Sequence, residues 1–555
     1  MASFKRVSLI LLTSCASAAL AGCDGATSVA SPGPGTLVIS TPAPAAPTPT
    51  PTATGLAPIT AAQFASTAGG SATFPITVEE QLALVNAGTN NVPSGFSALN
   101  GVVAQGAAAT APGFNATTLN PTGTSFFVTA NYVGAVNGSG DTAFQGWTCD
   151  SSAATFGGTT QRLCVAQAPV GAGASAAVCP TGTTDDGLAM AGTTVLARLC
   201  RIPALITSDL TLPRVLGVAY RLRGQTEVGV DVGSTGMAAG GTSATLTIAA
   251  GVVIAADSSE ASNDLLLINR GSRINAVGTS SAPIIFTSQQ NLAANGVSDA
   301  TQGQWGGVVI LGRAPTGVCR TGTGPNDAAG SSTTCENPIE GITGRNYGGT
   351  VQNDNSGTLQ FVQINYSGIA ISEGNELQGL TLGGTGSGTT INRVQSHNSA
   401  DDGIEIFGGT TNLSFLAITG ADDDGFDIDN GYRGLAQFLI AAQKSSGATA
   451  DSFATEIDSN GAEDLLPRTW ARYANFTFIT RSASQNPPAS IRLRGGADGT
   501  FVNGIIQTPT GVACVNITAT QISATDRTTV RAASTALQDQ GPPVFNSVYF
   551  ACQGR

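Results

Sequence analysis

Short runs of apolar residues, many of them β-branched, alternate with polar positions along most of this chain. Examples are Leu246–Ala256, with the sequence LTIAAGVVIAA, and Leu265–Ser288, with the sequence LLLINRGSRINAVGTSSAPIIFTS. Glycine, asparagine and aspartate separate the runs, which are too short for amphipathic helices and typical of strands joined by turns. The pattern predicts an all-β protein.

The strand pattern repeats with a period of 22 residues between His397 and Gly431. Asp401, Asp402 and Gly403 recur as Asp423, Asp424 and Gly425, and the IEI of Ile404–Ile406 recurs as FDI. A fixed period of this length indicates a solenoid, and strand-forming units of this size fit one coil of a parallel β-helix. We therefore predict a β-helix over residues 215–520, preceded by an N-terminal cap or accessory region over 59–214 and followed by a C-terminal cap over 521–555.

The first residues have the features of an export signal. Lys5 and Arg6 precede an apolar stretch that is too short to span a membrane as a helix. The following Leu20-Ala21-Gly22-Cys23 resembles the lipobox of bacterial lipoproteins, which implies a signal peptide over 1–22 and lipidation of Cys23. Residues 23–58 are rich in Pro and Thr and predict an extended tether. We expect a protein anchored by lipid in the cell envelope, at the outer membrane.

The cysteines predict disulfides. Of ten cysteines, Cys15 leaves with the signal peptide and Cys23 carries lipid, so eight remain in an exported chain. Metal binding is the rival interpretation, but the chain has no CxxC or Cys–His cluster. The simplest connectivity joins neighbours in sequence, as Cys149–Cys164, Cys179–Cys200, Cys319–Cys335 and Cys514–Cys552.

Several longer motifs carry a family resemblance. QWGGVVILGRAP (Gln304–Pro315), ADDGIEIFGG (Ala400–Gly409) and DDDGFDIDNGYRG (Asp422–Gly434) resemble segments of a group of bacterial exported lipoproteins. The resemblance covers about residues 215–510. It implies a right-handed parallel β-helix with a pectin-lyase-like fold. It implies no particular activity, because that group has no settled one.

The balance of acidic and basic residues limits the classes of partner that we expect. The chain carries 24 Lys and Arg against 36 Asp and Glu, for a net charge of −12, and lacks the basic footprint of a nucleic-acid-binding protein. The same balance disfavours a polyanionic polysaccharide, unless calcium bridges it to the protein.

The repeat also aligns acidic residues. Because side chains alternate along a strand, Ile404 and Ile406 point inward and Glu405 points outward. The same register places Asp427 and Glu456 in one outward column with Glu405, beside Thr381 on one side and Arg492 on the other. Carboxylates stacked on adjacent strands require protons or a cation. We predict a calcium site formed by Asp401, Asp402, Glu405, Asp423, Asp424, Asp427 and Glu456.

Two other interpretations of these residues stay open. Aspartates in turns often cap local backbone groups and need no ligand. Alternatively, Asp402 and Asp424, or Asp401 and Asp423, form the acid–base pair of a polysaccharide hydrolase, or Arg492 or Arg494 acts as the base of a calcium-dependent lyase. The only histidine, His397, is expected to make a structural hydrogen bond. We commit to no catalytic residue and expect a non-enzymatic β-helix that presents a rigid face to a glycan or an envelope protein, with the polysaccharide-active enzyme as the alternative.

Overall fold

The computed structural model describes residues 114–130, 132–137, 141–149, 164–259, 263–298, 300–317, 335–372, 374–444, 449, 452–459, 464–481, 489–517, 532–541 and 543–553. The predicted signal peptide, Cys23, the tether and Cys319 lie outside these residues. Within them, no helix has both the length and the apolar character needed to cross a membrane.

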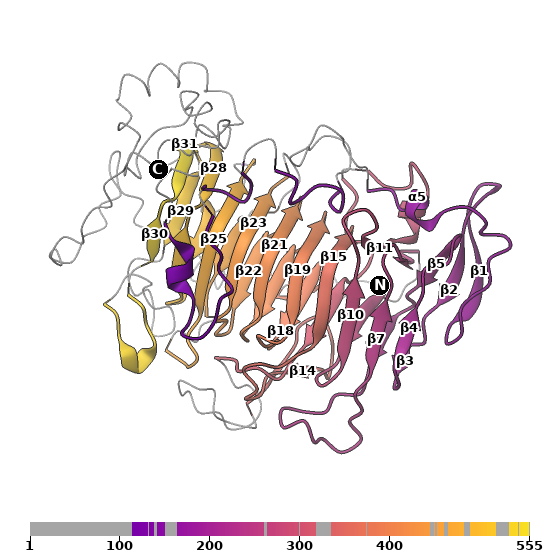
Figure 1. Ribbon diagram of the computed structural model, residues 1–555, viewed down its shortest axis with the longest axis horizontal. Helices are drawn as coiled ribbons and strands as arrows, with labels where there is room; N and C mark the ends of the chain where they lie inside the picture. Colours follow the sequence, from indigo (N-terminus) through magenta and orange to yellow (C-terminus); the bar gives the residue numbers. More distant parts are fainter. Residues whose placement is uncertain are drawn as a thin grey trace, which may run out of the picture.

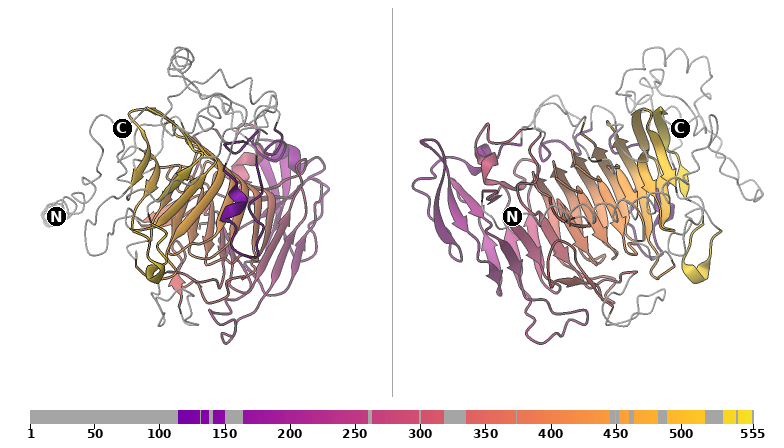
Figure 2. Two further views of the ribbon diagram at one scale, coloured as in Figure 1. Left: turned by 60° about the vertical axis from the view of Figure 1, so that its left-hand side comes forward. Right: turned by 180° about the vertical axis from the view of Figure 1, so that it is seen from behind.

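The described chain winds into coils whose strands stack side by side along the long axis of the molecule (Figures 1 and 2). One sheet has ten strands, all paired in parallel. They are β3 (Leu205–Ile206), β6 (Gln225–Val228), β9 (Leu265–Ile268), β12 (Val308–Leu311), β18 (Leu380–Gly383), β20 (Ile404–Phe407), β22 (Phe426–Asp429), β24 (Thr455–Ile457), β26 (Ala489–Leu493) and β29 (Ala513–Ile517).

The other large sheet has seventeen strands. They are β1 (Thr184–Ala191), β2 (Thr194–Arg201), β4 (Leu210–Leu212), β5 (Val218–Arg221), β7 (Thr245–Ile248), β8 (Val253–Ala256), β10 (Arg273–Val277), β11 (Ile284–Ser288), β15 (Gly357–Asn365), β19 (Thr390–His397), β21 (Asn412–Thr419), β23 (Leu435–Ala442), β25 (Trp470–Ile479), β27 (Asp498–Val502), β28 (Ile505–Thr510), β30 (Val544–Asn546) and β31 (Tyr549–Gln553). The described helical turns are short: η4 (Ala116–Leu119), α5 (Gln167–Val170), η5 (Gln289–Leu292) and η6 (Thr535–Leu537).

The seventeen-stranded sheet bends within its long central strands. Phe361, Phe415 and Phe438 have positive φ angles of 53°, 53° and 62°, which turn the chain without ending the strand. Inward residues resume directly after the bend, as Leu359 and Val362 in β15 show, and both are fully buried. Each of these coils therefore has three strand segments around one core.

The alternation predicted from the sequence is confirmed inside the coils. Ile404 and Ile406 stack in register on Phe426 and Ile428, and all four are buried in the same apolar cluster. Burying one such side chain stabilises the fold by about 1.5–3 kcal/mol. The fold class, an all-β parallel β-helix, is confirmed.

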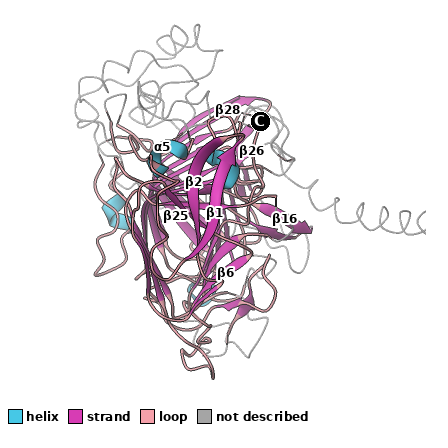
Figure 3. Cartoon of the chain, turned by 90° about the vertical axis from the view of Figure 1, so that its right-hand side faces the viewer, coloured by secondary structure: helices cyan, strands magenta, loops and turns pink. Residues whose placement is uncertain are grey.

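Parallel pairing extends beyond the expected limits of 215 and 520. It begins with β2, which pairs in parallel with β5, and it continues to β31, which pairs with β28. The first strands escaped the sequence pattern because β3 and β4 have only two and three residues. The antiparallel strand β1 pairs with β2 and covers the end of the stack (Figure 3).

Two small hairpins leave the coils. One joins β13 (Asn337–Pro338) to β14 (Asn346–Tyr347), and the other joins β16 (Ile369–Ser372) to β17 (Asn375–Leu377). The first hairpin packs on the outer face of the ten-stranded sheet, where Ile339, Ile342 and Tyr347 join one apolar cluster with Val309 and Leu311 of β12. This cover determines how much of that face solvent can reach.

The described residues of 114–149, which we call the N-terminal strap, lie against coils that come much later in the chain. In Figure 1 the indigo strap lies beside the yellow and orange strands β25 and β30, far from β1. Amide side chains of the coils hydrogen-bond the strap backbone: Asn503 contacts Phe114, Gln437 contacts Val128, Asn475 contacts Tyr132 and Gln363 contacts Trp147. Phe144 and Trp147 also pack against Phe415 and Phe361 at the bends. The strap therefore ties coils together from outside.

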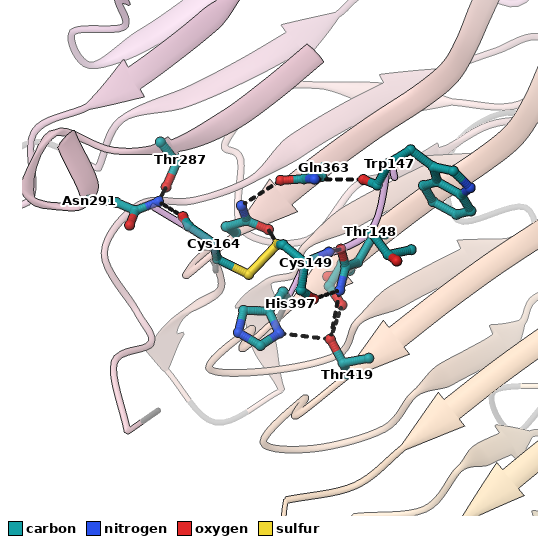
Figure 4. The surroundings of a disulfide bond; sticks show 12 residues. Trp147, Thr148, Cys149, Cys164, Thr287, Asn291, Gln363, His397 and Thr419 are labelled. Atoms are coloured by element: carbon teal, nitrogen blue, oxygen red, sulfur yellow. Dashed lines mark hydrogen bonds between the residues drawn. A yellow bond between two sulfur atoms is a disulfide. The ribbon is translucent and has the colours of Figure 1, made fainter. Parts of the chain in front are cut away.

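Three of the predicted disulfides are present: Cys149–Cys164, Cys179–Cys200 and Cys514–Cys552. Cys335 is disulfide-bonded as well, while its predicted partner Cys319 lies outside the described residues. Figure 4 shows Cys149–Cys164 fastening the strap, with Asn291 donating to the Cys164 carbonyl and Gln363 to that of Trp147. Pairing by sequence neighbours is confirmed for these three bonds.

Asn503 offers a test of the strap. Its Oδ1 accepts from Phe114 N at 2.8 Å, its Nδ2 donates to Phe114 O at 2.7 Å, and its φ is 53°. Asn503→Gly should lower the free energy of unfolding by about 2 kcal/mol, because two partly buried hydrogen bonds are lost while the backbone stays unstrained. Asn503→Ala should lose about 1 kcal/mol more, from left-handed strain. Urea denaturation measures both, and equal stability of the two variants would contradict the strain argument.

Candidate functional site

The outer face of the ten-stranded sheet carries the predicted column of acidic residues. Thr381 pairs with Glu405, Glu405 with Asp427, Asp427 with Glu456, and Glu456 with Arg492. This order along β18, β20, β22, β24 and β26 is the order predicted from the repeat. Before Thr381 the column is occupied by Val309 and Leu267, with Glu227 of β6 beyond them, and after Arg492 it ends on Asn516.

The acidic column points away from the core, yet solvent barely reaches Glu405 and Glu456, while Asp427 between them is partly exposed. Glu405 and Glu456 are only 6% and 5% exposed. The cover is the segment that includes the β13–β14 hairpin, where the Glu340 carboxyl hydrogen-bonds Glu405 and the Tyr347 ring packs against Phe407. The predicted outward direction is correct, but the column is a covered strip and not an open surface.

Two groups of carboxylates are close enough to share an ion. Asp401, Asp402 and Asp423 form one, and Asp402, Glu405 and Asp427 form the other; within each group the contributing oxygens lie within 4.8 Å of one another. These five residues belong to the seven predicted calcium ligands, while Asp424 and Glu456 are in neither group. The Asp-rich groups can therefore hold a metal ion.

Two of the aspartates also serve the turns. Asp402 Oδ1 accepts from the backbone N of Asp424 at 2.8 Å, and Asp424 Oδ1 accepts from the backbone N of Phe453 at 2.5 Å. Each carboxyl thus bridges its own turn to the next coil, as the turn-capping interpretation expects. Asp402 and Asp424 are 6% and 4% exposed, so a polysaccharide cannot reach this pair without moving the cover.

Glu405 is different, because the turns make no use of it. It lies within the strand β20, and its Oε2 is buried without a hydrogen-bond partner. The Glu340 carboxyl beside it accepts a hydrogen bond from Gln378 Nε2 at 2.5 Å, and Gln378 Nε2 also lies 3.2 Å from Asp401 Oδ2. Buried polar atoms are nearly always satisfied, so this oxygen is one that a cation in the second carboxylate group can satisfy.

The electrostatics of the strip demand a compensating charge. Burial, followed by repulsion from neighbouring carboxylates, raises the pKa of Asp401 to about 8. The same causes raise the pKa well above the usual range for Asp402, Glu405, Asp424, Asp427 and Asp429. At neutral pH these groups therefore hold protons or surround a cation.

Among the described residues, arginines contact the strip at its far end. Arg494 lies 2.8 Å from Asp458 and also contacts Glu456, but its side chain is 45% exposed, which weakens both pairs. Arg492, the candidate lyase base, follows Glu456 in the column and donates to Asn516 Oδ1. Both arginines are therefore placed at the end of the strip and not beside Asp402.

His397 makes the structural hydrogen bond expected of it. It is the last residue of β19 and only 4% exposed, its Nδ1 lies 2.7 Å from Thr419 Oγ1, and its ring meets Tyr366 edge to face (Figure 4). Glu340 and Gln378, which complete the surroundings of Glu405, were not among the predicted residues. Glu340 lies outside the repeat, so no periodic signal marks it. Gln378 precedes Gly379 as Asp402 precedes Gly403, so the coil register could have placed it beside the predicted ligands.

Comparison with protein families shows which family shares this architecture. Residues 230–542 match the family described as the pectate-lyase like beta helix domain. No curated protein and no solved structure matches the chain. The match spans more than half of the 555 residues and agrees with the parallel pairing of both large sheets. The chain therefore belongs to the family of pectate-lyase like beta helix domains.

Proposed function

We propose that this chain is a non-enzymatic, lipid-anchored protein of the cell envelope that presents its rigid β-helix to a glycan or an envelope protein. The Leu20–Cys23 lipobox and the Pro/Thr-rich tether favour lipidation of Cys23 and an outer-membrane location. The observation that carries the non-enzymatic part is the burial of the acidic residues: Asp402 and Asp424 accept hydrogen bonds from main-chain N–H groups, and both are nearly covered.

Calcium is the cation we propose for the strip. Calcium prefers carboxylate and carbonyl oxygens, accepts irregular geometry and takes six to eight ligands. Asp402, Glu405 and Asp427 offer three such oxygens, from the turn before β20, from β20 and from β22. Of these residues, Glu405 has a buried oxygen, Oε2, without a hydrogen-bond partner. A bound ion would join β20 to β22 across the coils, which is a stiffening role and requires no substrate.

Thermal melting with and without calcium tests this role. After chelation, an excess of calcium should raise the melting temperature, because a ligand that binds only the folded state at hundredfold excess over Kd adds about 2.7 kcal/mol. The double variant Glu405→Gln/Asp427→Asn should lose most of this rise. Asp185→Asn, which changes an acid paired with Arg198 far from the strip, should keep it. An unchanged melting temperature, or an equal rise in the double variant, would remove calcium from the proposal.

The alternative is a polysaccharide hydrolase or lyase that uses Asp402, Asp424 and Arg492. It ranks second because both aspartates are nearly covered and are bonded to main-chain N–H groups. Release of reducing ends or unsaturated sugars from a polysaccharide, abolished by Asp402→Asn in a folded variant, would establish it.

A further inference from the structure

A second charged cluster lies at the start of β23 and β25, on the outer side of the seventeen-stranded sheet. Two guanidinium groups converge there on one indole ring: Arg472 lies 4.2 Å and Arg433 5.3 Å from the centre of the Trp470 ring. Arg472 and Trp470 belong to β25, and Arg433 precedes β23 in the turn after Gly431. Converging positive charges are unusual in a chain with a net charge of −12.

Neither guanidinium has an acidic partner in the described part of the chain. Arg433 donates to the carbonyl of Arg468 at 2.9 Å, and Arg472 donates to the carbonyl of Arg433 at 2.5 Å. Asp498 is the acidic residue whose charge acts on Arg433, but its carboxylate already pairs with Arg468. Among the described residues, the direct contacts of the two guanidinium groups are thus carbonyl oxygens and a π face.

Burial makes this arrangement unfavourable without a further ligand. Arg472 is 6% exposed, and its Nε is buried with no hydrogen-bond partner. Burial, followed by repulsion from Arg433, lowers the pKa of Arg472 to about 10. Arg433 and Trp470 are partly exposed, so a ligand can approach the pair from solvent on their side.

Arg393 shows that an aromatic contact by itself is no sign of a site. It lies over the rings of Phe361 and Phe415, at 5.2 Å and 4.3 Å, and donates to its neighbour Asn392. It stands as a single guanidinium on two rings, which cation–π attraction can stabilise. The cluster at Trp470 differs because two guanidiniums share one ring, so two like charges lie close together and an anion between them would reduce their repulsion.

We propose that Arg433, Arg472 and Trp470 form a binding site for a small oxyanion group, meaning a carboxylate, sulfate or phosphate. Arg433 supplies the reachable N–H donors, since guanidinium forks match the paired oxygens of such groups. Arg472 adds its charge from the buried side of the cluster, and the Trp470 ring holds both side chains in place. The site goes beyond the proposed function: it needs no metal ion and does not use the acidic strip.

Calorimetry on the purified full chain tests this site, at constant ionic strength and after metal ions and the chelator have been removed by dialysis. The probes are sodium sulfate, inorganic phosphate and glucuronate, with glucose as the uncharged control. Saturable binding of at least one anion is expected, and Arg433→Gln should weaken it about tenfold or more. The strongest probe distinguishes a carboxylate ligand, such as an acidic sugar, from a tetrahedral one.

Arg393→Gln is the matched control, because it removes a guanidinium from aromatic rings without touching the cluster. It should bind the anion as the unchanged protein does. Arg433 is partly exposed, so Arg433→Gln is expected to fold even where Arg472→Gln does not. Absence of saturable binding for all three anions, or equal affinity of Arg433→Gln and the unchanged protein, would overturn the proposal. Because metal ions have been removed, either result is independent of whether the acidic strip binds calcium.

Discussion

In the absence of divalent cations, the protein should lose stability as the pH rises from about 4 to about 8. Burial and mutual repulsion raise the pKa of Asp401 to about 8, against an unfolded value of about 3.9. Between these two values the folded state binds more protons than the unfolded state, so each rise in pH favours unfolding. Asp402, Glu405 and Asp427 shift in the same direction. The expected total loss is on the order of 5 kcal/mol.

Urea denaturation in chelator at about pH 5 and about pH 8 measures this loss. The double variant Asp401→Asn/Glu405→Gln should flatten the dependence, because two of the raised carboxyls no longer titrate. Asp185→Asn, outside the strip, should leave it unchanged. Greater stability at pH 8 than at pH 5 in chelator would show that the strip is not protonated in the folded protein.

The stabilisation of the folded state by calcium should be largest at pH values where few of the strip carboxyls are protonated. At about pH 8 the carboxylates are charged and available as ligands, whereas at about pH 5 protons compete with the ion. The stabilisation by calcium should therefore increase with pH and offset much of the alkaline loss. This opposition separates a resident cation from turn-capping aspartates, whose hydrogen bonds to Asp424 N and Phe453 N need no metal.

The register of the strip could be predicted because it depends only on local periodicity. The alternation of side chains along the strand predicts that Glu405 points outward, and the 22-residue repeat predicts that Asp427 pairs with it on the next coil. Both rules act within a coil or between neighbouring coils. The same locality explains why the three observed disulfides, with sequence separations of 15, 21 and 38, could be paired as neighbours.

The burial of the strip could not be predicted, because segments outside the repeat provide it. Glu340 lies 65 positions before Glu405 in a hairpin with no periodic sequence, yet it hydrogen-bonds Glu405. The N-terminal strap is an extreme case: Phe114 and Asn503 are 389 residues apart. In a solenoid only neighbouring coils are implied by the pattern, so contacts that run along the outside leave no local signal.

Removal of Arg468 should strongly destabilise the C-terminal coils. The Arg468 side chain is 1% exposed and lies 3.4 Å from Asp498 and 3.3 Å from Asp539, which are themselves almost fully buried. Arg468→Met leaves both carboxylates without their cation, which typically costs about 3–5 kcal/mol. Its third partner, Asp464, is partly exposed and remains hydrated.

Three measurements distinguish loss of charge from loss of packing in Arg468→Met. Adding Asp498→Asn and Asp539→Asn should restore most of the stability, because no buried charge then remains unpaired. The variant should also be less stable at about pH 8 than at about pH 5, by a larger margin than the unchanged protein. The reason is that burial already raises the pKa of Asp498 to about 7, and the positive charge of Arg468 keeps this pKa from rising further.

Amide exchange is the third measurement. Asp498 Oδ2 also accepts a hydrogen bond from Gln540 N at 3.1 Å, so exchange over residues 532–541 should accelerate first in Arg468→Met. A loss that is equal at both pH values and unaffected by the asparagine substitutions would assign Arg468 to packing alone.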